Sequence, residues 1–212
     1  AKAYAEADAK AQPKPTKGVP ITIDDPIVEK AIREELTVFA RMYRSYNKPT
    51  GELTTADLEK VRDLTLADNQ LTRIPKELEK LTKLKRLDIS YNQLTDVKGL
   101  ENLTQLTVLN LDGNKLADVT GLEKLTKLEM LRLPNSQLTK LPKGLEKLTQ
   151  LRALNLWLNQ LTDVKGLEKL TQLTRLSLQK NQLTDVKGLE NLTQLKELKL
   201  FGNELTSVKG LE

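Results

Sequence analysis

LKRLDISYNQLTDVKGLENLTQ, residues 84–105, is the unit from which most of this chain is built. Its first part has the spacing Leu-x-x-Leu-x-Leu-x-x-Asn, and the same frame recurs along the chain. Each copy is too small to bury its apolar residues alone, so the copies must stack into a solenoid. The seven copies begin at Val61, Leu84, Leu106, Leu128, Leu151, Leu173 and Leu195, in steps of 22 or 23 residues.

Each copy contains one short strand with two different faces. Leu87 and Ile89 are two residues apart and point to one side, while Arg86 and Asp88 point to the other. We expect the apolar side to face inward, where each buried leucine contributes roughly 1.5–3 kcal/mol. The spacing and the period are those of a leucine-rich repeat, which predicts an α/β repeat solenoid.

A polar residue follows each strand. Asn suits this bend because its short amide can bond to neighbouring backbone groups where the chain turns away. The fourth copy has Ser136 instead, and we expect a weaker bond there. The asparagines at this position are Asn69, Asn92, Asn114, Asn159, Asn181 and Asn203.

The composition of the 212 residues fits one elongated domain with much surface, since 38% are hydrophobic and 30% are charged. No apolar run approaches the roughly 18 residues of a membrane span, so no transmembrane segment is predicted. Lys and Arg number 34 against 29 Asp and Glu, which gives a net charge of +5. This mixed balance does not favour nucleic acid as a partner.

The chain contains neither cysteine nor histidine. It therefore lacks a thiol nucleophile, an imidazole base, a disulfide and the ligands of an ordinary zinc site. We expect no catalytic residues, no bound metal and no cofactor. An enzymatic interpretation would depend on carboxylates such as Asp88 and Asp112.

Three parts follow one another along the chain. Residues 1–20 contain three prolines and no hydrophobic period, and we expect a disordered tether. Residues 21–60 should form a helical N-terminal cap that covers the end of the first repeat. Residues 61–212 are the seven repeats, of which the last is incomplete.

Capping residues mark two helices within the cap. Asp25 suits an N-cap and Pro26 the first helical turn, where its missing N–H costs nothing. Thr54 or Thr55 should cap a shorter helix that leads into the first repeat.

The segment TVFARMYRSY, residues 37–46, gathers aromatic side chains in a chain that is 3% aromatic overall. Its pattern extends the first helix through Phe39, Met42, Tyr43 and Tyr46. Two interpretations stay open: the rings complete the cap, or they form a contact surface on it.

The cap and the repeats together resemble the bacterial internalin-type leucine-rich-repeat proteins. DDPIVEKAIREEL and LTTADLEKVRDLTLADNQLT in the cap region, followed by copies of LTDVKGLEKLTQL, carry this resemblance over residues 21–212. It implies a right-handed curved solenoid with parallel strands on its concave face and an N-terminal helical cap. It also implies export and recognition of a protein on the concave face.

The two chain ends bear on this resemblance. No LPxTG-like wall anchor is present, and the chain stops in mid-repeat at Gly210-Leu211-Glu212. The small, charged residues after Ala1 are typical of a chain from which a signal peptide has been removed, although a trimmed expression product would look the same. We expect an exported protein, which is secreted, periplasmic or on the cell surface.

The repeats differ from one another mainly on their strands. Beyond the strand they barely change, as NQLTDVKGLENLTQ at 92–105 and NQLTDVKGLEKLTQ at 159–172 show. One interpretation is a recognition surface whose strand residues were diversified individually. The other is that turn geometry holds the return limb constant while the strand residues drift.

Trp157, the sole tryptophan, lies among apolar and Arg side chains of adjacent repeats. An exposed Trp flanked by Arg is typical of an interaction hot spot, and an apolar patch with a polar rim marks a contact surface. The candidate partner-binding residues are Arg86, Tyr91, Met130, Arg132, Pro134, Trp157, Leu158, Arg175 and Phe201.

The sequence thus predicts a non-catalytic, monomeric protein that binds a macromolecule, in particular a protein, on its concave strand face. One alternative is an assembly protein that self-associates weakly through the C-terminal coil or the aromatic cap segment. Another is an engineered consensus scaffold without a natural partner.

Overall fold

The computed structural model describes residues 18–43, 46–47, 50–117, 119–209 and 211. Most of the expected N-terminal tether, residues 1–17, lies outside the described residues. Pro20, at the end of that segment, already belongs to strand β1 and pairs with Thr54.

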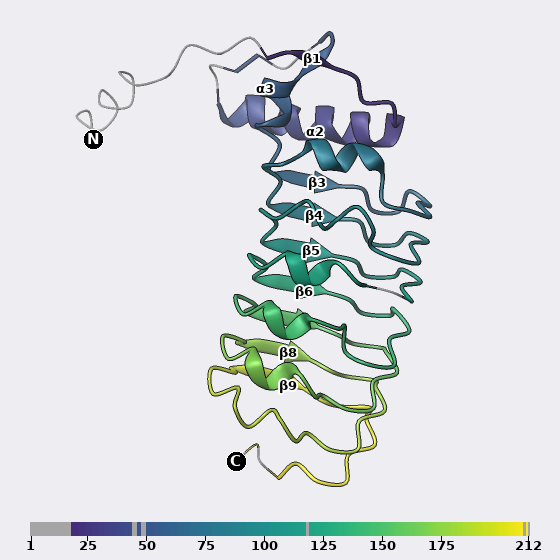
Figure 1. Cartoon of the computed structure of the whole chain (residues 1–212), viewed down its shortest axis with the longest axis vertical. Helices are drawn as coiled ribbons and strands as arrows, with labels where there is room; N and C mark the ends of the chain where they lie inside the picture. Colours follow the sequence, from purple (N-terminus) through teal and green to yellow (C-terminus); the bar gives the residue numbers. More distant parts are fainter. Residues whose placement is uncertain (1–17, 44–45, 48–49, 118, 210, 212) are drawn as a thin grey trace, which may run out of the picture.

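The repeats stack as seven coils around one parallel sheet, as Figure 1 shows. The coils begin at the seven residues that open the repeats, and each contributes one strand paired in register with the next. Leu64, Leu87 and Leu109 are thus direct neighbours across the sheet. The strands are β3 (Asp63–Thr65), β4 (Arg86–Asp88), β5 (Val108–Asn110), β6 (Met130–Arg132), β7 (Ala153–Asn155), β8 (Arg175–Ser177) and β9 (Glu197–Lys199).

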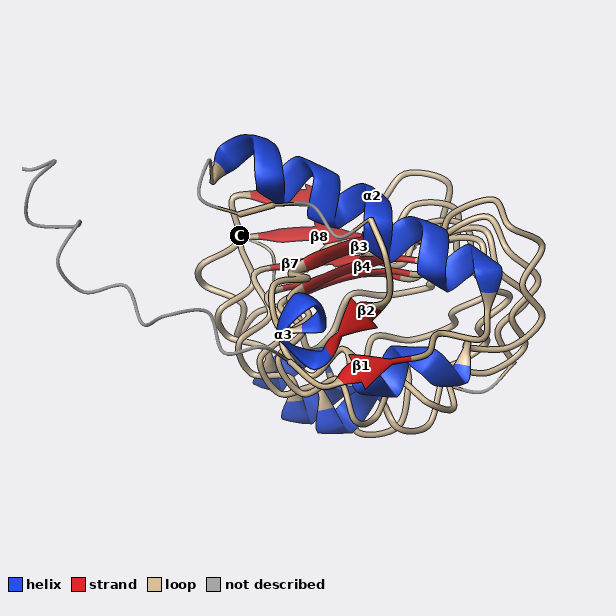
Figure 2. Cartoon of the chain, turned by 90° about the horizontal axis from the view of Figure 1, so that it is seen from above, coloured by secondary structure: helices blue, strands red, loops and turns tan. Residues whose placement is uncertain are grey.

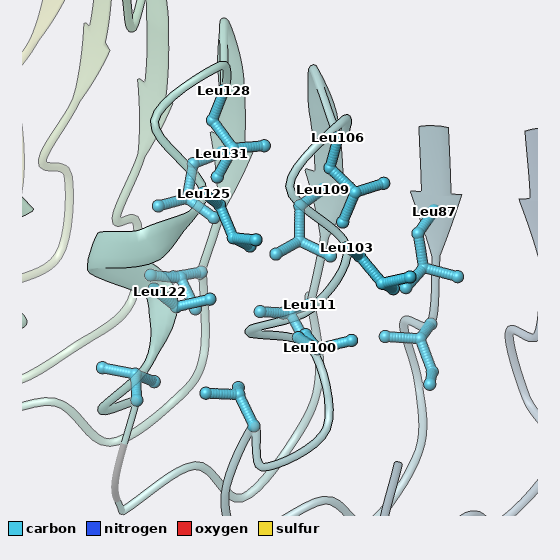
Figure 3. Packing of buried hydrophobic residues seen from close by; sticks show 14 of the residues in the cluster. Leu87, Leu100, Leu103, Leu106, Leu109, Leu111, Leu122, Leu125, Leu128 and Leu131 are labelled. Atoms are coloured by element: carbon cyan, nitrogen blue, oxygen red, sulfur yellow. The ribbon is translucent and has the colours of Figure 1, made fainter. Parts of the chain in front are cut away.

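The interior of the coils is filled with leucine. Leu87 and Ile89 are buried while Arg86 is exposed, so the predicted strand register is confirmed. In Figure 3, Leu103 and Leu125 of the returning limbs lie near the strand leucines of their own coils. Each coil therefore buries its leucines against its own strand and against its neighbours, as the predicted right-handed leucine-rich-repeat solenoid requires.

Short helical turns form part of the limb that returns from one strand to the next. The three that lie between β5 and β8 begin after a glycine with left-handed backbone geometry, a conformation that costs glycine little. The turns are η2 (Lys76–Lys80), η3 (Leu122–Lys124), η4 (Leu145–Lys147) and η5 (Leu167–Lys169).

Helix α2 (Pro26–Met42) lies across the first coil, as Figure 1 shows. Asp25 caps it by accepting the N–H groups of Ile27 and Val28, so the predicted N-cap is confirmed. The stripe that includes Val28 and Ile32 is buried in the core shared with the coils. The described residues include no helix long and apolar enough to cross a membrane.

The cap also contains a small two-stranded sheet, which Figure 2 shows beside α2 when the solenoid is seen from above. Strands β1 (Pro20–Ile21) and β2 (Leu53–Thr54) pair antiparallel, and helix α3 (Thr55–Leu58) follows directly. Thr54 and Asp57 form a reciprocal capping box, so Thr54 is the capping residue of the two that the sequence allowed.

The aromatic segment is divided between the cap and the solvent. The sequence pattern extended the helix to Tyr46, but the helix ends at Met42. Tyr46 instead turns back, donates a 2.8 Å hydrogen bond to the Asp57 carboxylate and meets the Phe39 ring edge-on. Met42 and Tyr43 stay exposed, so the rings complete the cap only in part.

The strand-ending asparagines tie each coil to the coil before it. In Asn92 the side-chain oxygen accepts the N–H groups of Asn69 and Leu71 at 3.1 and 2.9 Å. Its amide nitrogen donates to the carbonyls of Leu66 and Ile89 at 2.9 and 3.0 Å. This single buried side chain thus bridges coils 1 and 2, which is more than the local turn role that we predicted.

The asparagine bridge is missing between coils 3 and 4. Ser136 is fully buried, and its hydroxyl donates to the carbonyl of Pro134 in its own coil at 3.1 Å. The weaker bond predicted at this position is therefore confirmed. Among the described residues, the Ser136 side chain makes no hydrogen bond to coil 3.

The backbone of this junction is also less well connected. Between coils 2 and 3, the N–H of Tyr91 donates to the carbonyl of Asp112 at 2.7 Å. At the other junctions, two backbone N–H groups donate to carbonyls of the neighbouring coil. Gly113 and Gln137 are the equivalent residues between coils 3 and 4. In the described part of the chain, neither makes its bond between coils 3 and 4. Strands β5 and β6 still pair in register there.

Candidate functional site

The concave strand face is formed by four residues of each coil, which in coil 2 are Arg86, Asp88, Ser90 and Tyr91. Its charges are separated along the solenoid. We call coils 1–3 the acidic half, with Asp63, Asp68, Asp88 and Asp112 against one cation, Arg86. We call coils 4–7 the basic half, with Arg132, Arg175, Lys180 and Lys199 against one carboxylate, Glu197.

Polar groups in the acidic half satisfy one another. Arg86 forms an ion pair with Asp63 across the first two strands. Asp88 accepts hydrogen bonds from the Ser90 hydroxyl at 2.6 Å and the Asn110 amide at 3.0 Å. These contacts engage Asp63, Arg86 and Asp88 within the acidic half.

A tyrosine projects from the acidic half. Tyr91 is 62% exposed and adopts a left-handed backbone conformation with φ of 52°. Its ring lies so close to Gly113 that a Cβ there would stand 2.7 Å from the ring. The glycine in coil 3 is therefore what allows the tyrosine of coil 2 to lie against the next coil.

The basic half contains a hollow of about 270 Å³ over strands β6–β9. Its floor is low because Ala153, Asn155 and Ser177 are small residues in adjacent strands. Longer side chains surround this floor. They are Met130, Arg132, Arg175, Gln179, Glu197 and Lys199.

Apolar side chains are exposed beside the hollow. Trp157 and Leu158 follow β7 and are 36% and 39% exposed, although Leu158 takes a left-handed φ of 55° that is unfavourable for a branched side chain. The Lys180 ammonium lies 5.8 Å from the centre of the Trp157 ring, within cation–π range. Phe201, two coils further on, is 62% exposed.

The cations around the hollow differ in their partners. Arg132 lies 3.4 Å from Asp112, and Lys199 lies 2.7 Å from Glu197. The hydrogen bond from Lys199, the charge of that lysine and the more distant charge of Arg175 lower the pKa of the Glu197 carboxyl. Arg175 itself forms no ion pair with any described residue.

The predicted site residues fall into four groups. Met130, Arg132 and Arg175 line the hollow, and Trp157 and Leu158 lie beside it. Arg86 and Tyr91 belong to the acidic half, while Phe201 projects from the last coil. Pro134 is buried, contrary to the exposed position that we expected, as are Ser90 and Asp112 at the same position of coils 2 and 3.

Sequence reasoning missed the small residues that form the floor of the hollow. Ala153, Asn155 and Ser177 attract no notice individually because none of them carries a distinctive side chain. The available signal was their position, since small residues occur at neighbouring outward positions of consecutive repeats.

Turn geometry explains the constancy of the return limb. Asp96 and Asp163 each accept the backbone N–H two residues later at 3.0 Å. Glu101 and Glu168 accept the N–H groups of the left-handed glycines Gly99 and Gly166 at 2.7 and 2.6 Å. The contrast between constant limb and variable strand is therefore no evidence for recognition by itself. Only the strand residues themselves indicate a site.

Family models for leucine-rich repeats match two parts of the chain. The model described as "Leucine rich repeat" matches residues 59–116, and the model described as "Leucine Rich repeats (2 copies)" matches residues 171–212. No curated protein matches the chain significantly.

Solved structures of bacterial leucine-rich-repeat proteins have the same fold. Internalin C2 of Listeria monocytogenes matches with a TM-score of 0.69 and 28% identity, over 94% of this chain and 95% of that one. The internalin InlF of the same species gives 0.70 and 27%, over 91% and 62%. A leucine-rich-repeat protein of Leptospira interrogans gives 0.68 and 33%, over 74% and 41%.

Proposed function

Because this chain is an internalin-like leucine-rich-repeat protein, we propose that it binds a protein partner on the concave strand face and catalyses no reaction. The basic half is the contact surface. The observation that carries this proposal is the exposure of Trp157 and Leu158 at the edge of a hollow rimmed by arginines.

Energetics support the choice of this half. Binding energy concentrates in Trp, Tyr and Arg side chains that become desolvated in pockets. In the basic half, Arg132 and Arg175 line the hollow, and Trp157 is exposed two residues after Asn155 of its floor. The acidic half offers Tyr91, but its one cation, Arg86, is already paired with Asp63, and Asp88 is held by Asn110. A partner there would have to replace existing contacts instead of adding new ones.

The carboxylates of the strand face are engaged in structural contacts. Asp88 is held by Ser90 and Asn110, and Asp112 lies 3.4 Å from Arg132. General acid or base catalysis needs a carboxyl group within reach of a substrate proton. These contacts support a binding role rather than a catalytic one.

The test compares two double variants in capture of surface and secreted proteins. Met130→Glu with Trp157→Glu places two negative charges beside the hollow. Met42→Glu with Val208→Glu makes matched changes at two exposed residues outside the strand face. We expect the first variant to lose a partner that the second retains, with both folded by circular dichroism. Equal capture by both variants would disprove this location.

Self-association is a second candidate function, favoured by the exposed apolar end of α2. Val38, Met42 and Tyr43 are 48%, 67% and 53% exposed and lie close together in sequence. Light scattering over a range of concentrations tests it. A mass that rises with concentration, and falls back in Met42→Glu, would favour assembly over a monomeric binder.

Export of the protein is a further part of the proposal. It is supported by the similarity to internalins, as the resemblance over residues 21–212 implies. Fractionation of the producing cells, followed by detection with an antiserum, tests it. Detection in the cytoplasmic fraction alone would contradict it.

A further inference from the structure

The hollow of the basic half is small and open to solvent rather than an enclosed pocket. At about 270 Å³ it lies below the range of roughly 300–1,000 Å³ that is typical of small-molecule pockets. It is open to solvent on the strand face and bordered by Trp157, so a protruding segment of a larger molecule can reach it. The geometry therefore fits a side chain that a partner inserts.

The charge of the hollow indicates the kind of side chain. Arg175 lines it and has no ion-pair partner among the described residues, whereas Arg132 and Lys199 each have a carboxylate within reach. A planar guanidinium binds a carboxylate through two parallel hydrogen bonds, which is among the strongest polar contacts in proteins. Among the described residues, Arg175 is thus the cation of this hollow without an ion pair, since Glu197 on the neighbouring strand is paired with Lys199.

The charge separation along the strand face restricts the partner further. An anionic polymer with uniform charge would be attracted by the basic half and repelled by the four carboxylates of the acidic half. A polypeptide can carry acidic residues in one short segment and other residues elsewhere. This difference favours protein over polysaccharide or nucleic acid.

We infer that the basic half recognises an acidic, extended segment of its protein partner, in which one Asp or Glu side chain enters the hollow and pairs with Arg175. An apolar residue beside that acid packs on Trp157 and Leu158. The inference rests on the proposed function and specifies the chemistry of the partner.

Selection from a random peptide display library on the immobilised full chain tests the inference. We expect the retained peptides to contain Asp and Glu at least twice as often as the starting library. The same selection on Arg175→Gln should lose this enrichment. Arg86→Gln is the matched control, because Arg86 lies in the acidic half and is already paired with Asp63. It should retain the enrichment.

The fluorescence of Trp157, the sole tryptophan, then measures affinity directly. Titration with the most enriched peptide should give a Kd at least tenfold lower than titration with its Glu→Gln and Asp→Asn counterpart, and Arg175→Gln should abolish that difference. A selection without binders, or without acidic enrichment, would overturn the inference. Tighter Arg175-dependent binding of heparin than of the peptide would do the same.

Partner capture separates this inference from the proposed function. If Met130→Glu with Trp157→Glu loses the partner and Arg175→Gln keeps it undiminished, the strand face binds a protein but not through an acid in the hollow. If the double variant also keeps the partner, the proposed contact surface itself is wrong.

Discussion

The two halves of the concave strand face share one backbone but differ in how they use their side chains. In the acidic half, Asp63 pairs with Arg86 and Asp88 is held by Asn110. In the basic half, Arg175 lines the hollow and has no ion pair with a described residue, and Trp157 is exposed. A repeat fold can therefore complete its polar contacts in one region and leave another open for binding.

The leucine core beneath both halves is the same, so the difference in their charged contacts lies on the surface. Leu111 of coil 3 and Leu156 of coil 5 occupy equivalent positions, and both are fully buried. Changing either to Ala should lower the free energy of unfolding by about 2–5 kcal/mol because a cavity forms. Urea unfolding measures both effects.

The surface control for this pair is Trp157→Ala. We expect it to lower the free energy of unfolding by much less than Leu156→Ala, because the Trp157 ring lies outside the core. If Trp157→Ala destabilised the fold as strongly as Leu156→Ala, the tryptophan would belong to the core and the comparison of two surfaces would fail.

The junction between the halves, coils 3 and 4, can be compared with the asparagine-bridged junction between coils 4 and 5. The side-chain oxygen of Asn159 accepts the N–H groups of Ser136 and Leu138, which Asn159→Ala would leave unpaired. This change should lower the free energy of unfolding by about 1–3 kcal/mol for each of these buried groups. Ser136→Ala should cost about 1 kcal/mol or less, because it removes one bond within a coil. Equal losses would mean that the serine connects the coils as well as the asparagines do.

Leu158 offers a test of whether the basic half gives up stability for binding. Gly113 has the equivalent position in the acidic half, and both residues have left-handed backbone geometry. Leu158→Gly should relieve strain and raise the free energy of unfolding by up to about 1 kcal/mol. The same change should weaken binding to the partner. A stabilised variant with full affinity would show that Leu158 has no role in recognition.

Acid should affect both halves alike, with the smallest effect of the four. Hydrogen bonds from backbone N–H groups lower the pKa of Glu101, Glu123 and Glu168 below the ordinary value of 4.5. A carboxyl group whose pKa is lower in the folded than in the unfolded state stabilises the fold at pH values above its unfolded-state pKa. This contribution is lost as the pH falls through its folded-state pKa. Stability should therefore decline slightly from about pH 5 downward.

Glu→Gln variants test the source of that decline. Glu101→Gln in coil 2 and Glu168→Gln in coil 5 should each flatten the decline to the same extent. A decline that only one of them reduces would mean that the return limbs differ between the halves, and the difference would no longer be confined to the surface.

Much of the fold could be predicted from the sequence because its determinants are local and repeated. The positions of Leu87 and Ile89 predicted the strand register, and Asp25 predicted the start of α2. The end of α2 was less predictable, because Tyr46 leaves the helical path to bond with Asp57, a residue from another helix. A local sequence pattern does not indicate a contact between two separate elements.

The candidate site was only partly predictable for a related reason. Trp157, Met130 and Arg175 could be found because their side chains are distinctive. The hollow exists because Ala153 and Ser177 have short side chains, and its depth depends on the lengths of side chains in four neighbouring coils. Pro134 follows its strand as predicted, but it is buried like Ser90 and Asp112 at the same position, which repeat spacing alone does not show.

The missing asparagine bridge at Ser136 has a mechanical consequence. A solenoid held by its two ends carries the load through every junction in series, and the least connected junction yields first. Coils 3 and 4 lack the side-chain bridge and two backbone bonds that join other coils. Under tension the molecule should therefore part at this junction, leaving the basic half and any bound partner together on one side of the break.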